Sequence, residues 1–237
     1  MKNVNVKGTI VSTDDKWIYD LLGIEATAPG DIEKEIREAD GEDITFVVNS
    51  GGGDVFAGNE INYLISQYRG ATTADIVGIA ASIATVICCG ADTVRMAAGA
   101  QYMIHNVSGC ASGDYKAMDH AKDVLLNANR TISNTYRLKT GMSEKQLLDL
   151  MNKESWMDAA QAKEYGFVDE IIGDESGILS GKKPTIYNVG YANIISDEVK
   201  EKIRDQYKTA TNPIAESTDI LIAKNKITIQ RMRGERL

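Results

Sequence analysis

Cysteine, histidine and long apolar runs are all scarce in this chain of 237 residues. Its three cysteines, Cys88, Cys89 and Cys110, are too few and too unevenly spaced for a disulfide framework or a zinc knuckle. We interpret Cys88 and Cys89, which lie in an apolar run, as small core residues. No segment approaches the roughly 18 consecutive apolar residues that a membrane-spanning helix needs. The first residues also lack the apolar core of a secretory signal. These absences favour a soluble, cytoplasmic protein with no membrane partner.

Basic residues are outnumbered, with 26 Lys and Arg against 34 Asp and Glu. Nucleic-acid binding needs clustered basic side chains, so the balance argues against a nucleic-acid partner. The charge is also unevenly divided. Residues 1–176 hold 15 basic and 27 acidic residues, a net of −12, whereas residues 177–237 hold 11 and 7, a net of +4. We therefore expect a compact domain at 1–173, followed at 174–237 by a linker and a basic, partly helical tail. A short helix is predicted over 196–207, with Ser196 as its N-cap.

Strand and helix patterns alternate through the first part of the chain. Periodicity predicts strands at 44–48, 72–77, 93–96 and 101–104. It predicts a helix that Gly70 terminates, a buried helix at 82–89 and a long helix at about 114–139. Such alternation indicates an α/β fold with largely parallel strands.

Two glycine-rich turns follow predicted strands. The first, residues 51–53, matches neither a dinucleotide-binding loop nor a phosphate-binding loop, and Asp54 would repel phosphate. Consecutive glycines do allow the backbone to approach a ligand closely. The second turn, residues 78–84, places Ser82 where a strand becomes a helix. From this turn alone, Ser82 could be a nucleophile on a sharp turn or simply a helix N-cap.

His105 ends an apolar strand and precedes a loop-like segment at 106–113. Active sites of α/β folds lie at the ends of strands, where a histidine can act as general base for a serine. A lone histidine in such a position is more often structural. The order of the features favours catalysis here, because a glycine turn is followed by Ser82 after 29 residues and by His105 after another 23.

A set of motifs then resembles a known family. They are Asn49-Ser-Gly-Gly-Gly53, Gly58, residues 78–84, Met103-Ile-His105 and the Ala-x-x-Ala-x-x-Tyr-Gly-x-Val-Asp pattern at 159–169. In this order they resemble the proteolytic subunit of Clp protease (ClpP) over roughly residues 5–173, and most of all the Clp-like head-maturation proteases of phages and prophages. The resemblance implies a ClpP/crotonase-like α/β fold of repeated β-β-α units, with a protruding handle helix and, here, a C-terminal appendage.

The same resemblance implies a serine endopeptidase. Ser82 would be the nucleophile, His105 the general base, and the backbone N–H groups of Gly53 and Ile83 the oxyanion hole. An extended polypeptide substrate would bind along the first glycine turn, at Gly52, Asp54 and Val55.

The resemblance also has implications for partners. It implies no cofactor and no metal, and a homo-oligomeric ring, either a heptamer or stacked rings, in which the long helix is the handle. It implies a role in capsid maturation or Clp-type proteolysis in the cytoplasm, the host's if the chain is phage-encoded. It assigns no ATP-driven unfoldase partner.

The third member of the triad departs from the family pattern. The family usually carries an aspartate just before the Ala-x-x-Ala helix, and the matching position here is Glu154. A glutamate can orient a histidine as an aspartate does. Asp158 fits better as the N-cap of the following helix, and Asp149 is the weaker alternative.

Two other classes of protein are alternatives to the peptidase. Crotonase-type acyl-CoA enzymes share this fold and oxyanion hole, but use carboxylates and do not need the Ser82–His105 pair. A catalytically silent assembly subunit would use the fold without the chemistry. The presence of Ser82 and His105 argues against the silent subunit, whereas Glu154 and the basic tail favour it.

Overall fold

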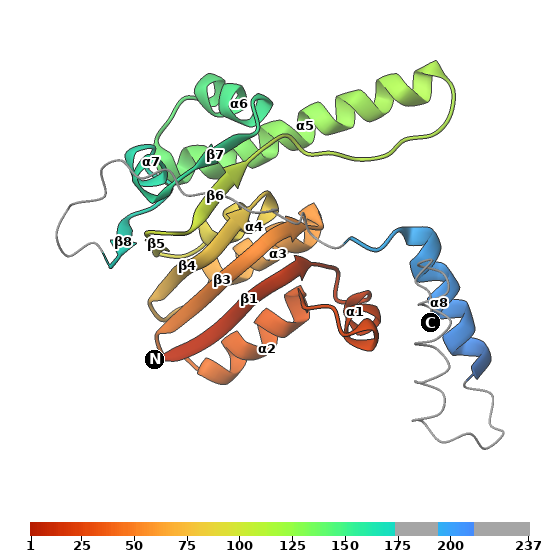
Figure 1. Cartoon of the computed structure of the whole chain (residues 1–237), viewed down its shortest axis with the longest axis horizontal. Coiled ribbons are helices and arrows are strands. Elements are labelled where there is room, and N and C mark those ends of the chain that lie inside the picture. Colours follow the sequence, from red (N-terminus) through yellow and green to blue (C-terminus); the bar gives the residue numbers. More distant parts are fainter. Residues whose placement is uncertain (174–193, 211–237) are drawn as a thin grey trace.

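The structure is a computed structural model, and it describes residues 1–173 and 194–210 of the chain (Figure 1). The predicted linker and the basic end of the tail lie outside these residues. Along the chain the elements are β1 (Lys2–Ile10), α1 (Lys16–Leu22), β2 (Ala26–Thr27), α2 (Pro29–Ala39), β3 (Ile44–Gly53), α3 (Val55–Ser66), β4 (Thr72–Ala81), α4 (Ile83–Cys88), β5 (Thr93–Ala97), β6 (Gln101–Ile104), α5 (Tyr115–Thr140), α6 (Glu144–Asn152), β7 (Ser155–Met157), α7 (Ala159–Glu164), β8 (Glu170–Ile172) and α8 (Asp197–Ala210).

The described strands form one sheet in the order β2-β1-β3-β4-β5-β8. Every neighbouring pair along this path is parallel. The predicted α/β fold with largely parallel strands is therefore confirmed. The sheet forks at β4, whose first half pairs with β5 and whose last three residues pair with β6. Beyond the fork, β6 pairs antiparallel with β7.

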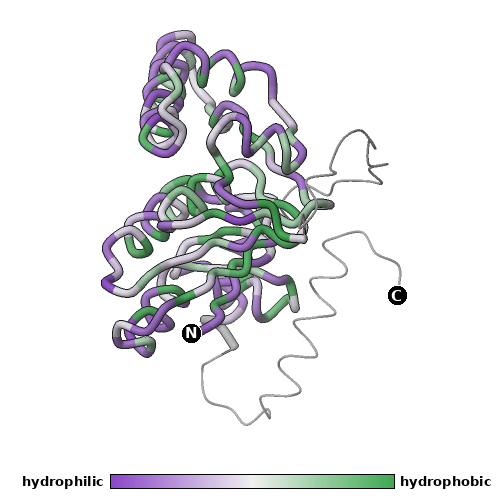
Figure 2. The backbone as a smooth tube through the Cα atoms, turned by 90° about the vertical axis from the view of Figure 1, so that its left-hand side faces the viewer, coloured by the Kyte–Doolittle hydropathy of each residue, from purple (hydrophilic) through white to green (hydrophobic). Residues whose placement is uncertain are grey.

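Burial alternates along the central strands, as expected for a sheet with one face packed against helices. On the buried face, β3 and β4 contribute Phe46, Val48, Ala74 and Ile76, which are at most 1 % exposed. Helix α3 contacts both α2 and α4, so the three helices form a continuous layer. Hydrophobic residues are concentrated along the central strands, while the outer helices carry long hydrophilic stretches (Figure 2).

Helix α5 projects from the body as an arm (Figure 1). Asp114 caps its start by accepting hydrogen bonds from the backbone N–H groups of Lys116 and Ala117. Only its second half is packed, because its buried residues begin at Asn129. The apolar stripe predicted for the helix is consequently half-buried at best in its first half, where Met118 is exposed. The handle-like helix predicted at about 114–139 is present.

Several predicted boundaries were wrong. Residues 51–53 were expected to form a turn but continue β3, where Gly52 and Gly53 pair with Thr9 and Ile10. Residues 78–81 likewise continue β4. The helix expected to run to Gly70 ends at Ser66, and Tyr68 lies beyond its end. Its hydroxyl accepts a hydrogen bond from the N–H of Gly41 and donates one to the carbonyl of Glu42.

Candidate active site

Irregularities in the sheet shape the two glycine segments. Between β3 and β4 the register shifts after Val48, so that β4 bulges around Gly78. Asn49 fills the bulge, and its Oδ1 accepts a hydrogen bond from the N–H of Ile79 at 3.2 Å. A Cβ on Gly78 would lie 2.5 Å from that same Oδ1, so a larger residue there would displace the exposed Asn49 side chain and break this contact. The first residue of the Asn-Ser-Gly-Gly-Gly motif is therefore bonded to the strand that leads to Ser82.

Ser82 sits on the sharp turn between β4 and α4. Its φ of 56° and ψ of −129° are a conformation that residues with a side chain rarely adopt. Ser82 occupies the N-cap position, but its hydroxyl makes no capping hydrogen bond. The turn is held instead by backbone, since the N–H of Ser82 donates to the carbonyl of Met103 at 2.9 Å. The hydroxyl is thus left to point at another partner.

That partner is His105. Its Nε2 lies 2.7 Å from Ser82 Oγ. Burial lowers the pKa of His105 below its ordinary value of 6.5, and the charge of Glu154 opposes part of that effect by raising it. The imidazole is consequently neutral at pH 7, as a general base must be. Ser82 and His105, 23 residues apart in sequence, therefore meet as the strand order predicted.

Glu154 approaches His105 through the pairing of β6 with β7. This antiparallel ladder ends at the pair of Ile104 and Ser155, so His105 and Glu154 are the residues next to the last paired positions. Glu154 itself lies in the turn that leads into β7, close enough for its charge to act on His105. Glu154 has a φ of 49°, and its Oε1 accepts a hydrogen bond from Trp156 Nε1 at 3.3 Å.

The two alternative acids have other partners. Asp158 is the N-cap of α7, and its Oδ1 accepts a hydrogen bond from the N–H of Gln161 at 2.8 Å, which confirms its predicted capping role. Asp149 lies on the exposed side of α6, where it forms an ion pair of 3.1 Å with Lys145. Of the three acids considered, Glu154 is the one whose charge acts on His105.

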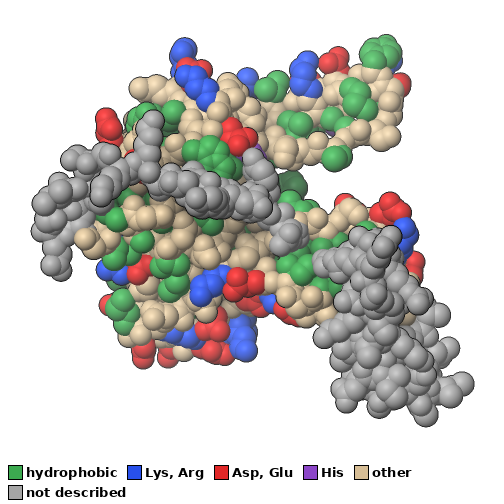
Figure 3. Space-filling model, viewed as in Figure 1, with side chains coloured by type: hydrophobic (Ala, Val, Ile, Leu, Met, Phe, Trp, Pro, Cys, Tyr) green, Lys and Arg blue, Asp and Glu red, His purple; other side chains and the backbone are tan. Residues whose placement is uncertain are grey.

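A pocket of about 290 Å³ opens beside the Ser82–His105 pair. Gly53 and Ile83, one from each of the two glycine segments, are part of its wall. Its apolar lining comes from elements far apart in sequence: Val55, Val86, Met103, Val107, Ile132, Tyr136 and Ile194. The arm formed by α5 overhangs an indentation of the molecular surface (Figure 3).

Close packing explains the glycines around Ser82. A Cβ on Gly52 would lie 2.7 Å from Ser82 Cβ, and one on Gly53 would lie 2.1 Å from the carbonyl oxygen of Ile10. Both have positive φ, 97° and 153°. On the other side, a Cβ on Gly58 of α3 would lie 2.2 Å from Ile83 Cγ1. Glycine thus allows β3 and α3 to pack directly against the serine turn, and β3 to pack closely against β1.

Of the three residues expected to bind substrate, only one lines the catalytic pocket. Val55 lines the pocket, but Gly52 and Asp54 do not. The N–H of Asp54 donates to the carbonyl of Ile10, and its carboxylate caps α3 by accepting a hydrogen bond from the N–H of Ala57. Asp54 lines a different hollow, beside Phe56 and Glu60. This placement argues against contact between Asp54 and a substrate in the catalytic pocket.

Sequence reasoning missed two contacts that fix the segment after His105. Asn129, a buried residue of α5, accepts a hydrogen bond from the N–H of Val107 at 2.7 Å. Asn106 Nδ2 donates to Asn152 Oδ1 at the end of α6, at 2.8 Å. The amphipathic pattern of α5 offered one clue, because Asn129 is a polar residue beside its apolar stripe.

In residues 1–173 and 194–210, no three His, Cys, Asp or Glu side chains form a group that could hold a metal ion. None of the helices in these two ranges is long and apolar enough to cross a membrane.

Solved structures include a similar fold. A mutant of ClpP1 from Listeria monocytogenes superposes with a TM-score of 0.60, over 74% of this chain and 93% of that one, at 24% sequence identity. The fold is therefore a ClpP-like α/β fold, as the motifs implied.

Sequence comparisons give the family. The family model described as Clp protease matches residues 35–175. The ATP-dependent Clp protease proteolytic subunit of Streptococcus pneumoniae is 33% identical over 139 residues, 57% of this chain and 71% of that protein. Proteolytic subunit 1 of Chlamydia abortus is 32% identical over 137 residues, 56% of this chain and 71% of that protein. The chain belongs to the Clp protease family, and this membership supports a peptidase activity.

Proposed function

We propose that this chain is a serine-type endopeptidase. The observation that carries the proposal is the distance of 2.7 Å between His105 Nε2 and Ser82 Oγ, with Ser82 on a strained strand-to-helix turn. An ordinary serine hydroxyl is a weak nucleophile and needs an adjacent base. The chain supplies such a base, and burial lowers the pKa of His105 so that the base is neutral.

The proposed reaction begins when Ser82 Oγ attacks the carbonyl carbon of a peptide bond. His105 Nε2 takes the hydroxyl proton and then gives it to the departing amine, which leaves an acyl-enzyme that water hydrolyses. In this tautomer Nδ1 carries the ring proton. Glu154, whose charge acts on His105, would hold the ring and stabilise the imidazolium.

The oxyanion would form beside Gly53 and Ile83. Ile83 is the first residue of α4, and the N–H groups of a helix's first turn have no partner within the helix. Gly53 lines the same pocket from β3. Removal of one oxyanion-hole donor, an asparagine side chain in subtilisin, costs about 2.7–4 kcal/mol of transition-state stabilisation.

Family membership supports a proposal about the substrate class. We propose that the substrate is a polypeptide, bound as an extended segment along the pocket, and that the chain acts in a homo-oligomeric ring. The exposed apolar side chains of α5, among them Tyr115, Met118 and Leu126, support a role for this arm in assembly. The phage-type resemblance makes capsid protein the substrate to test first.

A fluorophosphonate probe followed by intact-mass measurement tests this function. We expect one adduct on the full-length protein and none on Ser82→Ala. Ser108→Ala is the matched control, since Ser108 lines the same pocket without a catalytic role. This variant should be labelled like the unaltered protein. Gel filtration of each variant verifies that fold and assembly are retained.

The rival classes predict other outcomes. A folded, assembled chain that acquires no adduct would support the silent assembly subunit. An adduct that persists on Ser82→Ala would show that a different nucleophile reacts. Crotonase-type chemistry would leave acyl-CoA turnover largely intact in Ser82→Ala, whereas a peptidase would lose cleavage of a casein substrate in the same variant.

A further inference from the structure

Helix α8 of the C-terminal appendage packs against α1 (Figure 1). Ile203, 3% exposed, joins a small core with Val11, Ile18, Tyr19 and Ala28, which is separate from the main core. Near the other end of the contact the rings of Trp17 and Tyr207 lie 5.1 Å apart. The helix is therefore attached by apolar packing along its length.

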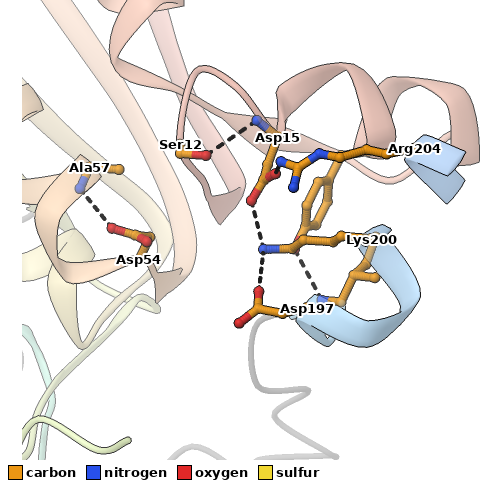
Figure 4. Close-up of polar contacts among 9 residues, drawn as sticks. Ser12, Asp15, Asp54, Ala57, Asp197, Lys200 and Arg204 are labelled. Carbon is orange, nitrogen blue, oxygen red and sulfur yellow. Dashed lines mark hydrogen bonds and ion pairs between the residues drawn. The ribbon is translucent and has the colours of Figure 1, made fainter. Parts of the chain in front are cut away.

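Ion pairs also join the docked helix α8 to the start of α1. Asp15, at the start of α1, forms ion pairs with both Lys200 and Arg204 (Figure 4). The distance to Lys200 is 2.7 Å, and the side chains of Asp15 and Lys200 are only 12% and 14% exposed. A carboxylate so shielded is strongly destabilised without its cations, so these pairs specify where α8 binds.

The segment just before α8 reaches the catalytic pocket. The N–H of Ile195 donates to the hydroxyl of Tyr19 at 3.1 Å, which ties this segment to α1. The preceding residue, Ile194, lines the pocket together with Ser82 and His105. Docking of α8 on α1 and placement of Ile194 at the pocket are thus consequences of one continuous segment, 194–207.

We propose that the α1 surface is a docking site for the chain's own helix α8, and that this docking holds Ile194 at the mouth of the catalytic pocket and restricts access of polypeptides. The proposal rests on the proposed function, because access matters only if Ser82 is reactive. Release of α8 opens the pocket. The appendage is then an intramolecular regulator of the peptidase.

Charge reversal on α8 tests the proposal. In Lys200→Glu/Arg204→Glu, the two new carboxylates face Asp15 and Asp197, and α8 is expelled. The matched control is Lys145→Glu/Lys202→Glu, which changes the net charge equally but alters two exposed lysines that pair within their own helices. Adding Asp15→Lys to the reversed helix restores opposite charges and should restore docking.

Two readouts are compared in the full-length protein: amide hydrogen exchange over 197–207 and the rate of fluorophosphonate labelling of Ser82. We expect the reversed helix to lose protection and labelling to rise about tenfold, the gain that follows if the docked form holds ~90% of the chains and reactivity follows the open fraction. The control should resemble the unaltered protein, and the Asp15→Lys combination should return toward it. Ile194→Gly, which leaves α8 in place, should also label faster.

Other outcomes would refute the proposal that docked α8 restricts access to the pocket. If α8 loses protection and the labelling rate changes less than twofold, docking does not control access. If the reversed helix stays protected, the ion pairs are not what holds it. An absence of labelling in every variant would refute both the proposed function and the regulation by α8. Equal labelling in all variants would refute the regulation by α8 alone.

Discussion

Gly58 packs against Ile83, and this contact gives a prediction about the stability of Gly58→Ala. Helix propensity alone would raise the free energy of unfolding of this variant, whereas close packing would lower it. Gly58 lies inside α3, where replacing glycine by alanine ordinarily stabilises a helix by about 1 kcal/mol. Here the new Cβ would lie 2.2 Å from Cγ1 of Ile83, which is 2% exposed and cannot move outward. Overpacking of this kind costs about 1–3 kcal/mol. At 2.2 Å we take the upper end, so Gly58→Ala should lower the free energy of unfolding by about 2 kcal/mol.

The second substitution removes the obstructing atoms. Ile83→Ala alone should cost about 3 kcal/mol, within the range for truncation of a buried isoleucine. In the double variant the new methyl group fills part of that space and the helix gain is recovered, so the total should be about 2 kcal/mol. The coupling energy would then be about −3 kcal/mol, far outside additivity.

Urea unfolding followed by the fluorescence of Trp17 and Trp156 measures these energies, at one protein concentration throughout. Gly99→Ala is the control, because its Cβ would have nothing within 4 Å. Peptidase activity should fall about 10²-fold in Gly58→Ala, since the shift of Ile83 moves a proposed oxyanion donor. A stabilised Gly58→Ala, or additive energies in the double variant, would refute the packing argument.

Two further predictions concern ionisable groups. Glu154→Gln should lower kcat/KM about 10³–10⁴-fold at neutral pH. It should also shift the acidic limb of the pH profile to lower pH, because the carboxylate raises the pKa of His105 and its loss lowers that pKa further. Asp158→Asn is the control and should leave the limb in place; a limb that moves upward in Glu154→Gln would contradict the assignment. In the folded chain a thiol reagent should modify the exposed Cys110 alone. Burial raises the pKa of Cys88, and raises that of Cys89 to about 12, so both should react only after unfolding, and fast reaction of either without denaturant would contradict this.

Medium-range patterns led directly to the core of the candidate site. The strands that precede Ser82 and His105 are marked by apolar, β-branched runs, and parallel strands deliver their ends to one edge of a sheet. That rule suffices to bring Ser82 and His105 together without knowledge of the whole fold. It did not extend to the start of the chain, where no element was predicted before residue 44 although β1, α1, β2 and α2 lie there.

The rule that parallel strands end at one edge of a sheet could not predict the role of Asp54. Its position after the glycine segment suggested contact with substrate. The structure instead uses both its N–H and its carboxylate inside the fold, because α3 begins at the next residue and needs a cap. Distinguishing a capping aspartate from a binding one requires the direction of its side chain, which sequence position does not give.

The sequence by itself determined the α/β class, the Ser82–His105 pair and the glycines around it, because each depends on local periodicity or on the steric freedom of one residue. Only the tertiary structure decided how Glu154 approaches His105, since the antiparallel register of β6 and β7 joins segments about 50 residues apart. It alone decided that α8 docks on α1 and brings Ile194 to the pocket. This docking joins Asp15 to Lys200 and Arg204, which are far from it in sequence. Such pairings depend on which surfaces the folded body leaves accessible, and local patterns along the chain do not reveal those surfaces.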